Sequence, residues 1–311
     1  MTRLLSDTAS LAAILMVTMF LTACATGPMD NDAELAPQIV SKPLARDSSW
    51  SLRLPEIENV LYQGVVNHDG AGTGTGSMFY PAPNIAGFLA ALITHGIINE
   101  SVKSSQKTKL QEDADKVLLP YRAVLANYSY KELMQQGLTR ILVGSGKKLI
   151  GHTEKATTSW LVESTPVFSM TQDHSAIIID NLISIYAPNQ PEAVVYQQVV
   201  RAVSQPWSGA DLVNYWSVEN GRVLKEMSVS LFVESVDIAL NDAINKAKPN
   251  NLPHKTFRYL EGRNEKMERG QLISEQCDRV VIRTLRDAPM SIPVRRDATA
   301  ASAKCVQASG H

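Results

Sequence analysis

Three long stretches of branched aliphatic residues stand out in the pattern of hydrophobic and polar positions along this chain. They cover residues 160–170, 176–186 and 193–203, and each predicts a β-strand. Turn-forming residues at 171–173 and 188–191 separate them. Because links this short can join only neighbouring strands that run in opposite directions, we expect an antiparallel meander.

Shorter stretches of the same kind occur on both sides of this meander. The pattern predicts strands at residues 60–66 and 139–143 before it, and at residues 256–260, 271–274 and 279–285 after it. Predicted strands therefore follow one another along most of the chain and do not alternate with helices.

A long helix is predicted between the two groups of strands, over residues 210–247, with an interruption at Asn220 and Gly221. Apolar residues recur in it every three or four positions, which would let one side of the helix cover a sheet face. This stripe consists of Phe232, Val236, Leu240, Ala243 and Ala247.

Helices are also predicted before the meander. Residues 101–126 form an amphipathic pattern that Pro120 breaks or kinks, and residues 130–136 form a shorter one that Gly137 ends. Residues 84–99 predict a helix whose interior, 85–98, is apolar all round. Such a helix is either buried in a core or in contact with a membrane, and it is too short to span a bilayer.

These patterns predict an α+β fold, in which helices pack on a largely antiparallel sheet. The expected organisation begins with a signal peptide at 1–23 and a flexible tether at 24–50. A domain over residues 51–296 follows, which could divide into a helical part, 84–137, and a sheet and helix part, 139–296. A flexible tail, 297–311, completes the chain.

Composition limits the partners of this domain. The chain of 311 residues carries 30 basic and 31 acidic residues, with a formal net charge of −1. Nucleic-acid binding is not expected, because no excess of positive charge is available for a phosphate backbone.

The first residues carry the most specific motif. The apolar run over residues 11–23 is 13 residues long, which is too short for a membrane span of about 30 Å but typical of an export signal. It ends at Leu21, Thr22, Ala23 and Cys24. This sequence resembles the lipobox of bacterial lipoproteins.

The resemblance implies cleavage between Ala23 and Cys24, a diacylglycerol on the Cys24 sulfur and acylation of the new amino terminus. Two or more acyl chains hold a protein on a membrane far more firmly than one. In the Gram-negative lipoproteins that this signal resembles, an aspartate after the cysteine favours the inner membrane. Ala25 stands there in this chain, so the resemblance implies a periplasm-facing anchor in the outer membrane.

Two further cysteines, Cys277 and Cys305, would lie in an oxidising compartment if Cys24 is acylated. They either form a disulfide or stay as free thiols.

No catalytic motif is complete in the sequence. The six histidines show no spacing typical of metal ligands, so no metal and no cofactor are expected. His152 and His174 are the first candidates for an active site assembled from distant residues. Trp207, Tyr215 and Trp216 could line a groove where a peptide or glycan stacks, or they could pack in the core.

Three functions follow as hypotheses. The first is a non-enzymatic module of the cell envelope that binds a protein partner and is anchored through its N-terminal lipid. The second is a hydrolase of cell-wall or small-molecule substrates. The third is an oligomeric, membrane-associated secretion or pore component that uses residues 85–98.

Overall fold

The computed structural model describes residues 43–66, 104–190, 193–245, 252–276 and 278–293. The predictions for Ala23, Cys24, Cys277, Cys305 and residues 84–99 lie outside these ranges.

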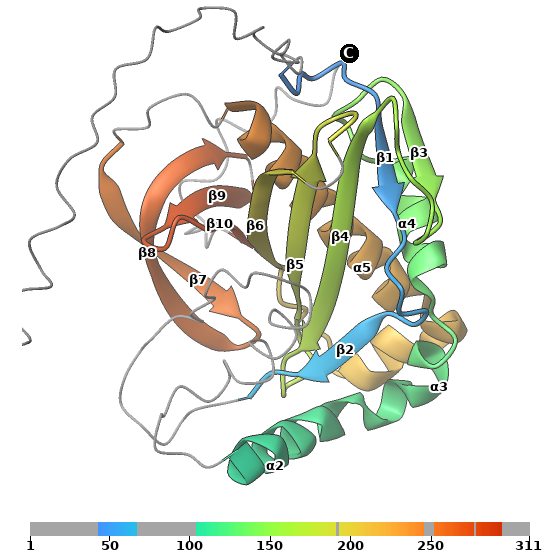
Figure 1. The fold of residues 1–311 in the computed structure, drawn as a ribbon. Coiled ribbons are helices and arrows are strands. Elements are labelled where there is room, and N and C mark those ends of the chain that lie inside the picture. The colour runs from blue at the N-terminus through green and yellow to red at the C-terminus, as the bar shows by residue number, and fades with distance from the viewer. Residues whose placement is uncertain (1–42, 67–103, 191–192, 246–251, 277, 294–311) are drawn as a thin grey trace, which may run out of the picture. The chain divides into compact units, whose positions relative to one another are not determined.

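Ten strands of the described residues form one sheet (Figure 1). In chain order they are β1 (Trp50–Arg53), β2 (Leu61–Gly64), β3 (Lys147–Ile150), β4 (Trp160–Met170), β5 (Ile177–Tyr186), β6 (Val194–Val203), β7 (His254–Glu261), β8 (Asn264–Glu275), β9 (Arg279–Thr284) and β10 (Pro289–Pro293). Their order across the sheet is β3-β1-β4-β5-β6-β10-β9-β8-β7, and β2 pairs with β4. Most neighbours are antiparallel, and the meander predicted for β4, β5 and β6 is confirmed.

Parallel pairs occur near the first edge and in the middle of the sheet. β1 and β2 both run parallel to β4, β1 beside its start and β2 beside its end. β3 pairs with β1, and β10 pairs with β6, again in parallel. The folded sheet thus begins at Trp50, the residue at which the predicted tether ends, and this indole is only 1% exposed.

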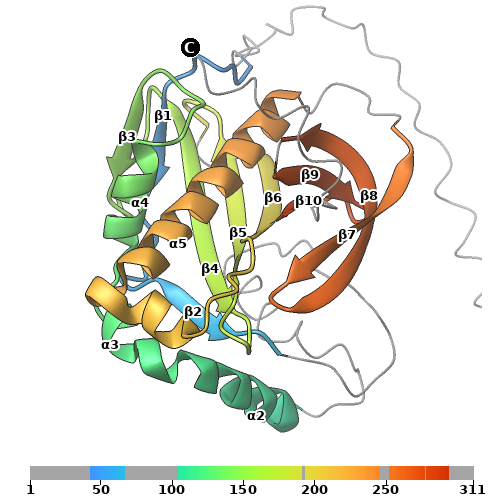
Figure 2. The same ribbon diagram turned by 180° about the vertical axis from the view of Figure 1, so that it is seen from behind.

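Helices cover one face of the first half of the sheet, so the predicted α+β class is confirmed. They are α2 (Ser104–Ala114), the 3-10 helix η1 (Asp115–Tyr121), α3 (Arg122–Leu125), α4 (Tyr130–Leu138) and α5 (Leu212–Asn245). α5 runs obliquely across β4, β5 and β6 (Figure 2). Three residues of the predicted stripe, Phe232, Val236 and Leu240, are fully buried in the core shared with the sheet. Ala247 lies outside the described residues.

The two expected irregularities of the helices are present. Pro120 lies inside the 3-10 helix η1, which separates α2 from α3, and proline cannot donate the backbone hydrogen bond of an α-helix. α5 is broken at residues 218–221, where Gly221 has a φ of 72°. A side chain at Gly221 would also collide with Val124, so glycine permits both the turn and the contact.

The strand predicted at residues 139–143 is wrong. Ile141 and Val143 are buried and Leu142 is 87% exposed, so the side chains alternate as in a strand. The backbone N–H groups of Leu142 and Val143, however, donate to the carboxylate of Asp237 on α5 and not to a neighbouring strand.

Two hydrophobic cores lie on opposite faces of the sheet. The larger core joins the helices to β4, β5 and β6, and Ile177, Ile179 and Ile183 point into it. The smaller core contains Ile178 and residues from β6, β7, β9 and β10. It forms because β7 and β8 curl over the face on which none of the described helices lies (Figure 1).

Contacts between distant turns hold this curl in place. The backbone N–H of Arg263, in the turn between β7 and β8, donates to Asp173 in the turn between β4 and β5 at 2.7 Å. A side chain at Gly262 would approach the Asp173 carboxylate to 2.8 Å, so this close contact requires glycine.

Candidate functional site

A groove of about 1170 Å³ lies between α5 and the strands that α5 does not cover. We call it the α5 groove. Its walls come from residues 230–245 of α5 and from residues 271–276 and 278–283 of β8, β9 and the segment between them, with Arg46 and Leu142 at the rim. It exists because α5 packs mainly on β5 and β6, while the same sheet continues through β10, β9 and β8.

Two ion pairs set the distance between the walls. Arg279 of β9 contacts Glu234 of α5 at 2.7 Å, and Arg283 contacts Asp242. From Glu234 to Asp242 the helix rises about 12 Å over eight residues, and from Arg279 to Arg283 the strand extends about 13 Å over four residues. Because these two separations match, β9 and α5 run side by side in the same direction along the groove.

Further hydrogen bonds position the acidic side chains. Glu234 also accepts from the Ser291 hydroxyl of β10, and Asp242 accepts from the Tyr196 hydroxyl of β6 at 3.0 Å. Asp237 accepts the two backbone N–H groups of the Leu142 loop, and burial raises the pKa of its carboxyl. The groove is therefore a preformed surface whose polar groups already have defined orientations.

The groove carries both charges and apolar side chains. Five carboxylates and three guanidinium groups line it, so its balance is acidic. Asp278, at the turn between β8 and β9, is exposed. Val233, Ile238 and Ile273 provide apolar surface between the charged groups. Apolar contacts inside a polar rim are the usual composition of a protein-binding surface.

A buried ion cluster lies on the other face of the sheet. Arg201 of β6 contacts Asp180 of β5 at 3.4 Å and Glu261 of β7 at 3.2 Å. All three residues are at most 8% exposed. Burial raises the pKa of Asp180 to about 6, against the lowering effect of Arg201. The cluster joins the end of β7 to the middle of the sheet, so it helps to hold the curled half in place.

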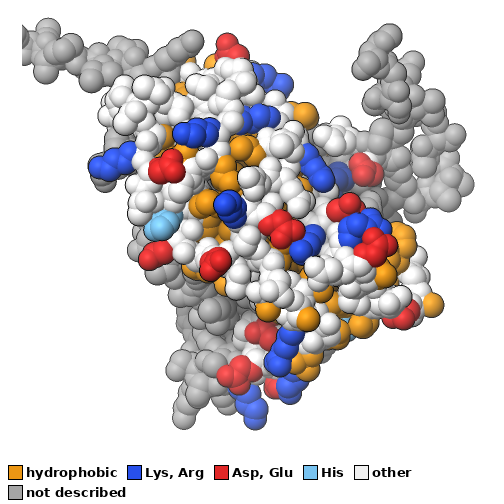
Figure 3. All heavy atoms as spheres, turned by 90° about the vertical axis from the view of Figure 1, so that its right-hand side faces the viewer, with side chains coloured by type: hydrophobic (Ala, Val, Ile, Leu, Met, Phe, Trp, Pro, Cys, Tyr) orange, Lys and Arg blue, Asp and Glu red, His pale blue; other side chains and the backbone are white. Residues whose placement is uncertain are grey.

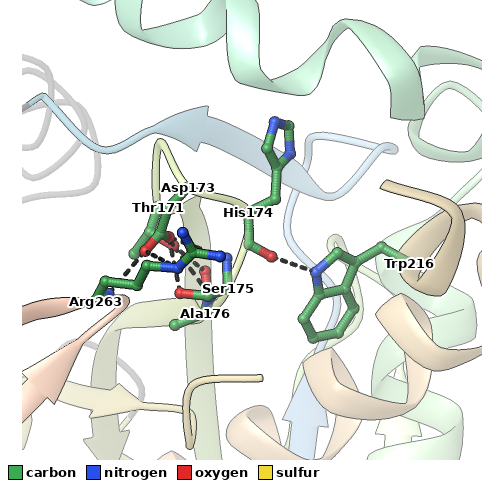
Figure 4. Close-up of polar contacts among 7 residues, drawn as sticks. All are labelled: Thr171, Asp173, His174, Ser175, Ala176, Trp216 and Arg263. Atoms are coloured by element: carbon green, nitrogen blue, oxygen red, sulfur yellow. Dashed lines mark hydrogen bonds and ion pairs between the residues drawn. The ribbon is translucent and has the colours of Figure 1, made fainter. Parts of the chain in front are cut away.

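His174, a candidate from the sequence, lies in the turn between β4 and β5. Its Nδ1 is 2.9 Å from the hydroxyl of Tyr121, and burial lowers the pKa of the imidazole. The side chain points away from the neighbouring Asp173, which instead bonds Thr171 and Ser175 (Figure 4). Within the described residues, no hydroxyl or thiol nucleophile forms a hydrogen bond with this ring other than the Tyr121 phenol.

His152, the second candidate, is exposed in the segment between β3 and β4. It does not lie beside His174, because the two occupy opposite ends of β4. The structure does not bring the two histidines together.

The aromatic residues singled out from the sequence do come together. Trp207 stacks on Tyr215, and Tyr215 contacts Trp216 edge to face. Trp216 is buried at 1% exposure, whereas Trp207 is 47% exposed. Core packing thus accounts for Trp216 but not for Trp207.

Charged side chains of both signs are interspersed on the side of the molecule where β3 and α4 lie, with hydrophobic side chains between them (Figure 3). Neither the positive nor the negative side chains form a continuous charged patch on that face. In the part of the chain that the structure describes, no three His, Cys, Asp or Glu residues are arranged to hold a metal ion. No helix among the same residues is long and apolar enough to cross a membrane.

Sequence reasoning missed the α5 groove. Its polar residues on α5 recur at 230, 234, 237, 241 and 245, which is the helical period on the side opposite to the apolar stripe. This spacing of polar residues is visible in the sequence, but a helix face that is simply exposed to water has the same pattern. Comparisons with protein families, curated proteins and solved structures found no match to this chain.

Proposed function

We propose that this protein is an outer-membrane-anchored periplasmic lipoprotein whose domain binds a protein partner of the cell envelope in the α5 groove. The α5 groove is the observation that carries the proposal. Its walls are fixed by ion pairs before any partner arrives, which lowers the entropy cost of binding. The lipobox-like sequence ending at Cys24 supplies the anchor.

The shape and charge of the groove favour an extended protein segment as the occupant. The groove follows two turns of α5 and four residues of β9, between Glu234 and Asp242 and between Arg279 and Arg283. A segment that carries basic side chains complements its acidic balance. Complementary charge increases the rate and the specificity of such an encounter.

The anchor is tested by feeding cells radiolabelled palmitate. We expect label on the wild-type protein and none on Cys24→Ala, and a mature product that begins at Cys24. Label on Cys24→Ala, or a mature amino terminus at another residue, would refute the anchor.

The groove is tested separately, with a photo-crosslinking amino acid at Ile273 in living cells. Ile273 is 38% exposed and lines the groove. The matched control is Met267, which lies on the same strand outside the groove and is 57% exposed. We expect one discrete envelope protein to be captured from position 273, none from 267, and loss of the adduct when Asp278→Lys reverses a charge in the groove. Equal capture from both positions, or capture that Asp278→Lys leaves unchanged, would refute partner binding in the groove.

A further inference from the structure

A second surface is formed by the pair Trp207 and Tyr215, which we call the aromatic ledge. Their rings stack with centroids 4.4 Å apart and an interplanar angle of 8°. Tyr215 in turn contacts the buried Trp216 at 4.9 Å and 72°. One face of the Trp207 indole is therefore covered by Tyr215, while the indole remains 47% exposed.

The ledge is held rigidly. The backbone N–H of Trp207 donates to the carbonyl of Ser175 at 2.7 Å, and Nε1 of Trp216 donates to the carbonyl of His174 at 2.6 Å. A Cβ atom at Gly209 would lie 2.7 Å from Nε1 of Trp207, so the chain passes close beside the indole. An exposed tryptophan that is fixed in this way loses little conformational entropy when a ligand stacks on it.

Polar side chains flank the ledge. Ser208 and Asp211 are exposed on the same short segment as Trp207. Asp211 caps α5 by accepting from the N–H of Asn214 at 3.0 Å. A hydroxyl and a carboxylate thus lie within four residues of the exposed indole along the chain.

This arrangement differs from the centre of a protein interface. A tryptophan that anchors a protein partner usually lies inside a wider desolvated, apolar patch. The residues that flank Trp207 on the loop to α5 are Gln205, Pro206, Ser208, Gly209 and Ala210, which apart from Pro206 are polar or small. A sugar ring is a better match, because it presents an apolar face of C–H groups for stacking and hydroxyl groups around its rim for hydrogen bonds.

We propose that the aromatic ledge is a carbohydrate-binding site, in which a pyranose ring of a glycan chain stacks on the open face of Trp207. Ser208 and Asp211, which are exposed on the same segment as Trp207, would hydrogen-bond the hydroxyl groups of that ring or of its neighbours. The site is separate from the α5 groove and does not depend on the proposed partner.

Fluorine NMR tests the site directly, because the chain has four tryptophans. The full-length protein is labelled with 5-fluorotryptophan, purified in a sugar-free detergent and titrated with the β-1,4-linked tetramer of N-acetylglucosamine. Trp207→Phe identifies the resonance of Trp207. We expect that resonance to shift with millimolar sugar while those of the buried Trp50 and Trp160 stay in place.

Two variants test whether the sugar binds on the ledge and not elsewhere on the domain. Binding of the tetramer, measured by calorimetry, should weaken about tenfold in Trp207→Ala. It should stay unchanged in Met267→Ala, which removes an apolar side chain elsewhere that is 57% exposed. No shift of the Trp207 resonance at saturating sugar, or equal binding by Trp207→Ala, would overturn the proposal. So would a photo-crosslinker at Ser208 that captures a protein in cells while purified peptidoglycan fails to compete.

Discussion

Replacing Arg201 by methionine should destabilise the domain strongly. The guanidinium group lies between Asp180 and Glu261. Counting side-chain atoms alone, Arg201 is 10% exposed, Asp180 4% and Glu261 8%. Methionine fills a similar volume without the charge. The variant leaves two buried carboxylates without the cation that lies between them.

The expected loss follows from the burial of these groups. Removing one partner of a buried ion pair costs about 3–5 kcal/mol, whereas an exposed pair contributes at most about 1 kcal/mol. For a domain of this size, each kcal/mol lowers the melting temperature by about 2–4 °C. We therefore expect Arg201→Met to melt about 10 °C below the wild type at pH 8.

The pH dependence of this loss distinguishes a charge effect from poor packing. Arg201 lowers the pKa of Asp180, so without it that pKa rises further above its ordinary value. Asp180 then becomes protonated, and neutral, at higher pH than in the wild type. The deficit of Arg201→Met should accordingly be larger at pH 8 than at pH 5.

Thermal melts followed by circular dichroism at the two pH values provide the assay. Arg222→Met is the control, because Arg222 pairs with Glu219 and Glu226 at the surface and is about half exposed. It should melt within about 2 °C of the wild type. The reasoning fails if Arg201→Met melts as the wild type does, or if its deficit is the same at pH 5 and pH 8.

Three further predictions test other contacts. Asp180→Asn should remove a pH dependence from the free energy of unfolding. Because the pKa of Asp180 is raised, the wild type loses roughly 2 kcal/mol of stability between pH 4 and 7. Urea melts of the two proteins should diverge by that amount over this range, and parallel pH curves would contradict the prediction. Gly64→Ala should cost at least about 2 kcal/mol in the same melts, because the added Cβ would lie 1.9 Å from the carbonyl oxygen of Ala114; an unchanged midpoint would show that the two segments separate freely. Ser129→Ala should cost about 1 kcal/mol, since its hydroxyl accepts from the N–H of Glu132 at the start of α4, and Ser129→Asp should retain most of that stability.

The sequence predicted the elements that are long enough to show a period. β4, β5 and β6 are ten or eleven residues each, and α5 carries its apolar stripe over several turns. β1 and β3 were not predicted, because each is four residues long and gains its strand character only by pairing with distant residues. β10 was not predicted either, since it begins at Pro289 and ends at Pro293, and proline is typical of turns and strand ends.

The error at residues 139–143 shows where periodicity stops being informative. Ile141, Leu142 and Val143 are all apolar, and their burial alternates as in a strand. What the sequence could not show is which group accepts the backbone hydrogen bonds of this segment. Asp237, about 95 residues away, accepts from the N–H groups of Leu142 and Val143, which in a sheet would donate to the carbonyls of a neighbouring strand.

The same long-range carboxylate links the fold to the α5 groove. The Leu142 loop forms part of the rim only because Asp237 draws it toward α5. On the opposite wall, Arg279 and Arg283 reach α5 through carboxylates that lie on either side of Asp237 in the sequence. Successive acidic residues on one helix face therefore bind a loop on one side and a strand on the other. The width of the groove is set by these side chains and not by the helix and sheet alone. Changing one of them should therefore alter the proposed partner binding even where the fold is retained.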